Sequence, residues 1–274
     1  MEKTRYIDPG EAAQGTQQAF TRRAFAKTSA VASVGIIGSA LLASAPVSAQ
    51  TLTDADILNF ALNLEYLEAE FYTKATTGKT IEQFGVGVSG SGTAGPTTGG
   101  RKISLGSSTM AIMDEIAENE REHVVFLRDA LGPAAVAKPA INLDALGAFS
   151  TDRQFLALAR AFEDVGVSAY GGAAKLIQNP DTLEAAARIA LTEAYHAGNV
   201  RLIIALKGIA TQMLDNNDYP PPPTGEKYFT TSRIGLAKIR TPSMVLAIVY
   251  GNSTKGTSRG AFFPNGVNGT IRTV

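Results

Sequence analysis

Cysteine and tryptophan are absent from this chain, and histidine occurs only twice, as His123 and His196. Without cysteine the chain can form neither disulfide bonds nor thiolate metal sites, and it has no thiol nucleophile. Any metal that it binds must therefore be held by nitrogen and oxygen ligands. Basic and acidic residues balance at 25 each, so the charge gives no indication of a nucleic-acid partner or of an anionic surface as partner.

Both histidines close a Glu-x-x-His motif, one formed by Glu120 and His123 and the other by Glu193 and His196. Each motif lies in a long stretch whose apolar residues recur at helical spacing. Residues three apart on an α-helix project from one face, so each glutamate lies beside its histidine. One such pair is weak evidence. Two pairs that contain every histidine of the chain favour a common site.

A four-helix bundle can build a two-metal carboxylate site when two helices each give a glutamate and the other two each give Glu-x-x-His. The chain supplies the two further helices, because residues 58–75 carry Glu65 and residues 155–174 carry Glu163. The order of the four elements indicates a helix pair that is used twice. The expected metal ligands are Glu65, Glu120, His123, Glu163, Glu193 and His196.

Each of these residues has a simpler interpretation when taken singly. A lone core histidine is usually a hydrogen-bonded structural residue, and a glutamate on an amphipathic helix is usually solvated. However, four inward carboxylates each cost several kcal/mol to bury without a partner, and no arginine or lysine lies on the same stripes. Two divalent metal ions would balance the four negative charges. Iron and manganese both accept this ligand set.

Three further residues are expected beside the ligands. Tyr72 and Tyr170 each follow a predicted ligand by seven residues, which returns them to the same helix face. An inner tyrosine is most often a core residue with its hydroxyl on a carboxylate, and support of a metal ligand is the alternative. Glu68 lies on the stripe next to Glu65 and is the second choice for a ligand. Glu70 is expected to face water.

The N-terminal residues resemble a twin-arginine export signal. Residues 21–27 read Thr-Arg-Arg-Ala-Phe-Ala-Lys and precede a mildly apolar run at 28–45, with small residues at 47–49. Serine and glycine interrupt the run, which is short and weak for a membrane span. We therefore expect residues 1–49 to be a leader and cleaved signal peptide. The protein would be periplasmic or secreted, with no stable membrane span after cleavage.

The rest of the chain divides at the four prolines of residues 220–223, which form a stiff spacer. We expect a four-helix bundle over residues 50–218 and a C-terminal extension over residues 219–274. The Gly/Ser/Thr-rich residues 85–100 predict a flexible surface loop within the bundle. Residues 260–266 are too apolar for a solvated tail. The extension should pack on the bundle or on a partner subunit, which leaves a homo-oligomer open.

Residues 62–72, 120–127 and 193–198 resemble the ferritin-like domain of the desiccation-related proteins of resurrection plants and bacteria. The tail resembles them through its Arg-Thr-Pro, Val-Tyr-Gly and Phe-Phe-Pro-Asn-Gly motifs, and the likeness covers about residues 53–266. It implies an all-α fold, a ferritin-like four-helix bundle with a C-terminal extension. It also implies a di-iron or di-manganese centre on the six expected ligands. The long first loop and the extension depart from storage ferritins and count against cage assembly.

Two functions follow from these expectations. In the first, an exported protein uses two metals to handle peroxide, dioxygen or ferrous iron under oxidative stress, with Glu120 and Glu193 bridging the metals. Glu65 and Glu163 are then terminal, with one histidine on each metal. In the second, the protein is a non-enzymatic desiccation protectant or structural binding protein whose site serves stability. An oxygenase would need an apolar pocket and an electron donor that the sequence does not show. No catalytic residue is expected outside the metal site, and whether the protein is an enzyme stays open.

Overall fold

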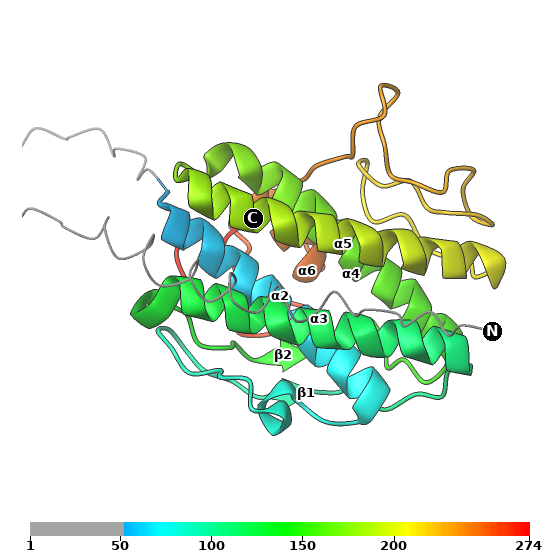
Figure 1. The fold of residues 1–274 in the computed structure, drawn as a ribbon, viewed down its shortest axis with the longest axis horizontal. Helices are drawn as coiled ribbons and strands as arrows, with labels where there is room; N and C mark the ends of the chain where they lie inside the picture. The colour runs from blue at the N-terminus through cyan, green and yellow to red at the C-terminus, as the bar shows by residue number, and fades with distance from the viewer. Residues whose placement is uncertain (1–51) are drawn as a thin grey trace, which may run out of the picture. The chain divides into compact units, whose positions relative to one another are not determined.

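Four long helices form the body of the protein (Figure 1): α2 (Asp54–Thr77), α3 (Ser107–Leu131), α4 (Asp152–Ala173) and α5 (Pro180–Leu206). This computed structural model describes residues 52–274, so the expected leader and signal peptide lie outside the described residues. Helix α2 packs chiefly on α3, and α4 packs chiefly on α5. The predicted all-α bundle, with a helix pair used twice, is confirmed.

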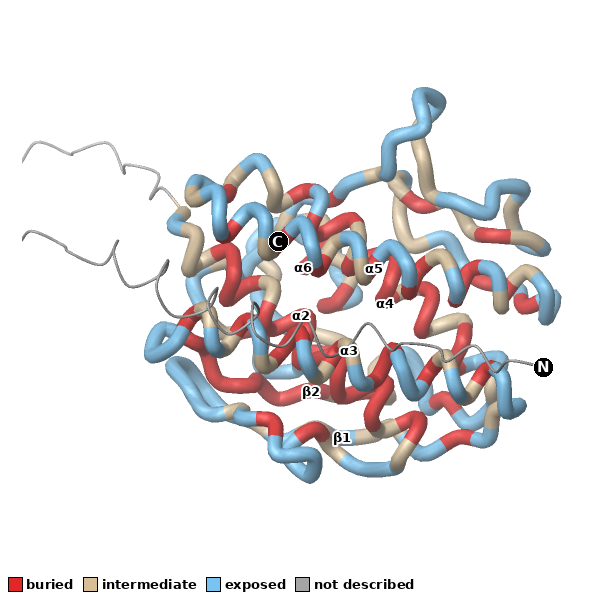
Figure 2. Tube along the Cα trace, in the orientation of Figure 1, coloured by how far each residue is buried: buried red, intermediate tan, exposed pale blue. Residues whose placement is uncertain are grey.

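Shorter elements connect and follow the four helices. They are the 3-10 turns η3 (Ile81–Phe84), η4 (Gly132–Ala134) and η5 (Ala174–Leu176), the two-residue strands β1 (Thr97–Thr98) and β2 (Ile141–Asn142), and the helix α6 (Pro242–Val249). Figure 2 shows that the buried residues line the inner sides of the four long helices. Among residues 52–274, no helix combines the length and the apolar character that a membrane span requires.

Local sequence fixes where α2 and α4 begin. Thr53 caps α2 because its hydroxyl accepts the amide hydrogen of Asp56 at 3.2 Å, while the Asp56 carboxylate accepts the Thr53 amide hydrogen at 2.9 Å. Thr151 and Gln154, whose types and spacing predict a capping box before the third helix, form that box at the start of α4. These reciprocal bonds satisfy amide groups that have no partner within the helix.

Two helix ends differ from those that the residues predict: Asn179-Pro180 is typical of the end of a helix, and the apolar residues that continue to Leu214 predict a longer fourth helix. Asn179 and Pro180 do not end α4, which stops at Ala173; instead Asn179 caps α5 and Pro180 is its first residue. A proline at this position loses no hydrogen bond. Helix α5 does not continue towards Leu214 but ends at Leu206, ahead of Gly208 at φ 59°. A glycine in the left-handed region commonly ends a helix.

The glycine-rich loop of residues 85–100 follows a fixed, hydrogen-bonded path, unlike the free loop that its composition predicts. Its strand β1 pairs in parallel with β2. A Cβ atom at Gly90 would lie 2.3 Å from the backbone oxygen of Ala135, so this close approach requires a glycine. The pairing is a long-range contact that composition alone does not reveal.

The C-terminal residues lie against the bundle. The ring of Phe262 is 5.1 Å from that of Phe162 in α4, and Phe263 is fully buried. Before α6, the buried Arg240 donates to the Ser168 hydroxyl at 2.8 Å. A Cβ atom at Gly172 would lie 1.8 Å from the Arg240 backbone oxygen, so this glycine lets the extension approach α4.

Candidate metal centre

All six expected ligands project into the middle of the bundle. Helix α2 gives one glutamate, α4 gives another, and α3 and α5 each give a glutamate and a histidine. The four carboxylates are between 0% and 1% exposed. The helical spacing therefore placed each side chain on the inner face of its own helix, and tertiary packing joined the four faces. The residues brought together are Glu65, Glu120, His123, Glu163, Glu193 and His196.

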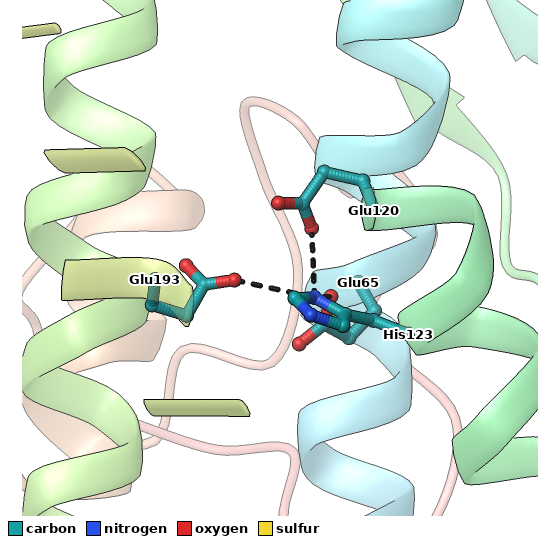
Figure 3. A group of neighbouring side chains, drawn as sticks. All are labelled: Glu65, Glu120, His123 and Glu193. Carbon is teal, nitrogen blue, oxygen red and sulfur yellow. Dashed lines mark hydrogen bonds and ion pairs between the residues drawn. The ribbon is translucent and has the colours of Figure 1, made fainter. Parts of the chain in front are cut away.

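Three carboxylates surround the ring of His123 (Figure 3). Its Nδ1 atom lies 3.2 Å from Glu65 Oε2, 3.5 Å from Glu120 Oε2 and 3.4 Å from Glu193 Oε1. These carboxylates come from α2, α3 and α5, so residues 128 positions apart in the chain meet at one imidazole. The four ligand atoms of this first group all lie within 4.8 Å of one another.

The second group is built in the same way around His196. The Nδ1 atom of His196 lies 2.9 Å from Glu120 Oε1 and 3.5 Å from Glu163 Oε2. Its ligand atoms, with one from Glu193, also lie within 4.8 Å of one another. Glu120 and Glu193 belong to both groups, which is the arrangement that two bridging carboxylates would have.

The carboxylate oxygens of this centre lack the partners that buried charges need. Both oxygens of Glu120, of Glu163 and of Glu193 are buried without a hydrogen bond from any residue that the structure describes. Within residues 52–274, their only ion-pair contacts are with the two histidines. Since an unpaired buried carboxylate costs several kcal/mol, this donor set fits divalent cations, which would supply the missing positive charge.

A family model described as a ferritin-like domain matches residues 53–206, which span all four long helices and all six expected ligands. The chain belongs to the ferritin-like family. No curated protein matches the chain. The family match covers the bundle and ends where α5 ends, so it does not include the C-terminal extension of this ferritin-like protein.

Asn119 is a site residue that the sequence does not indicate. Its Oδ1 atom lies 3.1 Å from His196 Nε2. With the proton on Nε2, the ring donates to Asn119 and leaves the Nδ1 lone pair free for a metal ion in the ferritin-like centre. Metal-bound histidines commonly hold their second nitrogen in this way. Asn119 directly precedes Glu120 and lies off the expected inner stripe, so no periodic signal marks it.

The three residues expected beside the ligands take different positions. The Tyr170 hydroxyl donates to Glu65 Oε1 at 2.5 Å. The Tyr72 hydroxyl is buried without a hydrogen bond among the described residues. Glu68 is buried and lies, like Glu193, beside Gly166. A Cβ atom at Gly166 would be 3.3 Å from Glu68 Oε1 and 2.3 Å from Glu193 Oε2. Their roles stay predictions.

Glu70, also on α2, does not face water as the sequence predicts. It is fully buried and forms an ion pair with Lys138, which also contacts Glu82 at 2.6 Å. Lys138 comes from the connection between α3 and α4, so the helical pattern of α2 could not reveal it. Glu70 lies outside both groups of candidate ligands.

The carboxylates and imidazoles shift one another's pKa values. Burial lowers the pKa of His196, but its contacts with Glu120 and Glu163 outweigh this and raise it to about 11. Burial raises the pKa of Glu65 to about 7, although the charge of His123 lowers it in part. Burial and the charge of Glu120 raise the pKa of Glu193 well above its ordinary value. The metal-free centre therefore holds protons, which a bound metal must displace.

The pKa of Glu120 is shifted in the opposite direction from the pKa values of the other carboxylates of the centre. Burial raises its pKa, but the neighbouring His123 and His196 together lower the pKa below its ordinary value. The same carboxylate raises the pKa of His123, with Glu65, against the effect of burial. Glu120 is therefore the carboxylate that keeps its negative charge between the two imidazoles in the metal-free centre.

An apolar cavity of about 20 Å³ borders the centre. Its walls include Leu58, Leu64 and Ala169, and it reaches Glu68 and Gly166. A cavity of this size holds about one water-sized molecule. The walls are mostly apolar, with Glu68 and Tyr170 as the polar residues of the lining, so they favour a small, weakly hydrated molecule.

Proposed function

We propose that this ferritin-like protein binds two divalent cations, iron or manganese, and uses them to handle peroxide, dioxygen or ferrous iron in protection against oxidative stress. The observation that supports this best is the pair of buried ligand groups that share Glu120 and Glu193. Two adjacent ions of these metals, when bound, can together accept or donate two electrons.

The residues of the centre divide into distinct roles. Glu65 and His123 would hold one ion, Glu163 and His196 the other, and the two shared glutamates would bridge them. Asn119 fixes the orientation of His196 through their hydrogen bond, as Tyr170 does for Glu65. The near-complete burial of the carboxylates would keep bulk water away from bound ions.

The size of the neighbouring cavity favours a small substrate. At about 20 Å³, it has room for a molecule such as dioxygen but not for an organic substrate. The cavity is apolar, as an oxygenase would need, but its volume argues against that alternative. Its position beside Glu68 and Gly166 gives a small molecule a place next to the ligands.

A second function is favoured by the same burial. The two histidines are only 9% and 5% exposed, and the four carboxylates less than that. A metal centre so far from solvent could serve stability alone. The protein would then be a structural metal-binding protectant, in keeping with its resemblance to the desiccation-related proteins.

Purified protein from the native host distinguishes the two functions. Its metal content is measured first, followed by peroxide loss and Fe(II) oxidation for the wild type and a Glu120→Ala variant. Glu115→Ala is the matched control, because Glu115 is an exposed glutamate of the same helix. Activity that only Glu120→Ala abolishes supports the first function. Inactivity of the fully loaded wild type supports the second, and a protein that never binds metal contradicts both.

A further inference from the structure

Helix α5 presents an uncharged outer face to solvent. From residue 189 to residue 206, about five helical turns, the only acidic or basic residues besides His196 are Glu193 and Arg201, and both are buried. The outer side chains of Leu191, Tyr195, Leu202 and Leu206 are between 48% and 78% exposed. A stripe of large apolar side chains along a surface helix indicates a surface that a partner covers.

The segment that follows α5 widens this apolar surface. Tyr228 and Phe229 are each at least half exposed, and with Tyr195 and Leu202 they line a groove of about 390 Å³. Figure 1 shows this segment as the orange loop beside the yellow part of α5. The stripe and the loop therefore form one continuous patch.

The patch is large enough for a stable interface. Its three aromatic side chains and three leucines together expose roughly 700 Å² of mostly apolar surface, if a fully exposed aromatic contributes about 200 Å² and a leucine somewhat less. A standard interface buries about 800 Å² on each partner. The largest apolar patch on a typical monomer is smaller, at roughly 300–600 Å².

The exposed side chains of the stripe are spaced symmetrically about Gly198 and Asn199. Leu191 lies seven residues before Gly198, and Leu206 lies seven residues after Asn199. Tyr195 and Leu202 lie three residues before and after the same central pair. Two copies of α5 that cross in antiparallel orientation at this pair would place leucine on leucine and tyrosine on leucine. Such a self-complementary stripe is what a two-fold interface requires.

Gly198 supports a close crossing at the centre of the stripe. A glycine inside a helix costs about 1 kcal/mol relative to alanine. At Gly198 a Cβ atom would meet no atom of the described residues within 4 Å, and its φ is not positive, so nothing in the described fold requires a glycine. A second helix whose backbone crosses at this point would require one.

We propose that the protein forms a two-fold dimer in which α5 packs antiparallel against α5 of a second copy, centred on Gly198 and Asn199. The uncharged face matches itself better than it matches an anionic membrane, since membrane-surface helices carry lysine and arginine along their polar face. The inner face of α5 carries Glu193 and His196, so the dimer would brace a helix that contributes to both ligand groups. The inference does not rest on the proposed function.

The mass of the full chain in solution tests the interface. We expect twice the mass of one 28.7 kDa chain by light scattering or sedimentation. Leu202→Arg should yield a monomer with an unchanged helical circular dichroism spectrum. The matched control is Leu146→Arg, because Leu146 is similarly exposed but lies outside the groove. A wild type that stays monomeric at micromolar concentration overturns the proposal, as does a dimer that survives Leu202→Arg.

Cross-linking tests the antiparallel register, and the absence of native cysteine makes it unambiguous. Gly198→Cys should form a disulfide with its own copy under mild oxidation, because the two positions face each other near the axis. Leu191→Cys and Leu206→Cys should cross-link when mixed but not separately. Leu146→Cys is the control. Cross-linking of Leu191→Cys to itself overturns the antiparallel arrangement, and a monomer that binds phosphatidylglycerol vesicles through Leu202 assigns the patch to a membrane instead.

Discussion

Tyr170 on α4 donates its hydroxyl hydrogen to Glu65 on α2 at 2.5 Å, so each helix pair of the bundle gives one partner of this bond. Both residues are buried. The bond fixes one oxygen of Glu65, while the other faces His123 at 3.2 Å. A core tyrosine thereby sets the orientation of a candidate ligand on the opposite helix pair, and this relationship can be tested directly.

Tyr170→Phe should weaken metal binding at the first ligand group by about 10-fold, because supporting residues of this kind typically contribute 10-fold or more to affinity. A titration against a competing chelator measures the change. Tyr250→Phe is the matched control, since Tyr250 is also a buried tyrosine but donates its hydroxyl hydrogen to the Arg272 backbone oxygen, away from both ligand groups. Equal effects of the two substitutions would contradict a role for Tyr170 in holding Glu65.

Glu120→Gln should reduce the metal content from two ions per chain to nearly none, whereas Glu65→Gln should leave about one. The reason is that Glu120 belongs to both ligand groups and Glu65 to only one. Elemental analysis of protein dialysed against each metal gives the two ratios. A Glu120→Gln variant that still holds two ions would show that this carboxylate does not bridge them.

The metal-free protein should lose stability as the pH rises from about 5 to 8. Burial raises the folded-state pKa of Glu65 from 4.5 to about 7, so the folded state binds more protons than the unfolded state in this window. Stability falls with pH wherever that holds, here by on the order of 3 kcal/mol for this one group. His196 acts in the same direction, because its pKa is raised from 6.5 to about 11.

Urea unfolding in the presence of a chelator, at several pH values, measures this dependence. With metal added, the dependence should reverse, because deprotonated ligands bind the ions more tightly at higher pH. Below about pH 4 the metal-free protein should instead lose stability as the pH falls. The reason is that the lowered pKa of Glu120 contributes stability that is lost on acidification. Metal-free stability that increases from pH 5 to 8 would contradict the proton-loaded centre.

Lys138→Met should destabilise the protein by about 3–5 kcal/mol, because it leaves Glu70 buried and without its ion-pair partner. Thermal or denaturant unfolding gives the value. The double variant Glu70→Met/Lys138→Met should recover most of the loss, and neither variant should change the metal content. A single variant as stable as the wild type would show that Glu70 is neutral or solvated.

The mature protein should begin at Gln50 when it is isolated from the periplasm or medium of its native host. This expectation rests on the twin-arginine pattern of residues 21–27 and the small residues before position 50. N-terminal sequencing identifies the first residue. Replacing Arg22 and Arg23 by lysine should keep the protein in the cytoplasm, and export that continues in this variant would exclude the twin-arginine route.

Much of the bundle and its centre could be predicted because helical periodicity is a local property. The spacing of apolar residues placed Glu65, Glu120 and Glu163 on inner faces, and the capping residues marked where α2 and α4 begin. The end of α5 was harder to locate, since apolar residues continue to Leu214 whereas the backbone turns at Gly208. A turn of this kind is set by backbone conformation and not by hydropathy.

The sequence by itself determined that the six candidate ligands face inward, because 3.6 residues per turn fix the helix face on which each residue lies. It placed Glu70 wrongly, because α2 is buried on nearly all sides. Only the tertiary structure decided which residues meet across helices: Lys138 on Glu70, Asn119 on His196 and Tyr170 on Glu65. Those partners come from different elements, and their contacts depend on how the helices and loops pack. The same packing left the outer face of α5 exposed, which no local pattern could reveal.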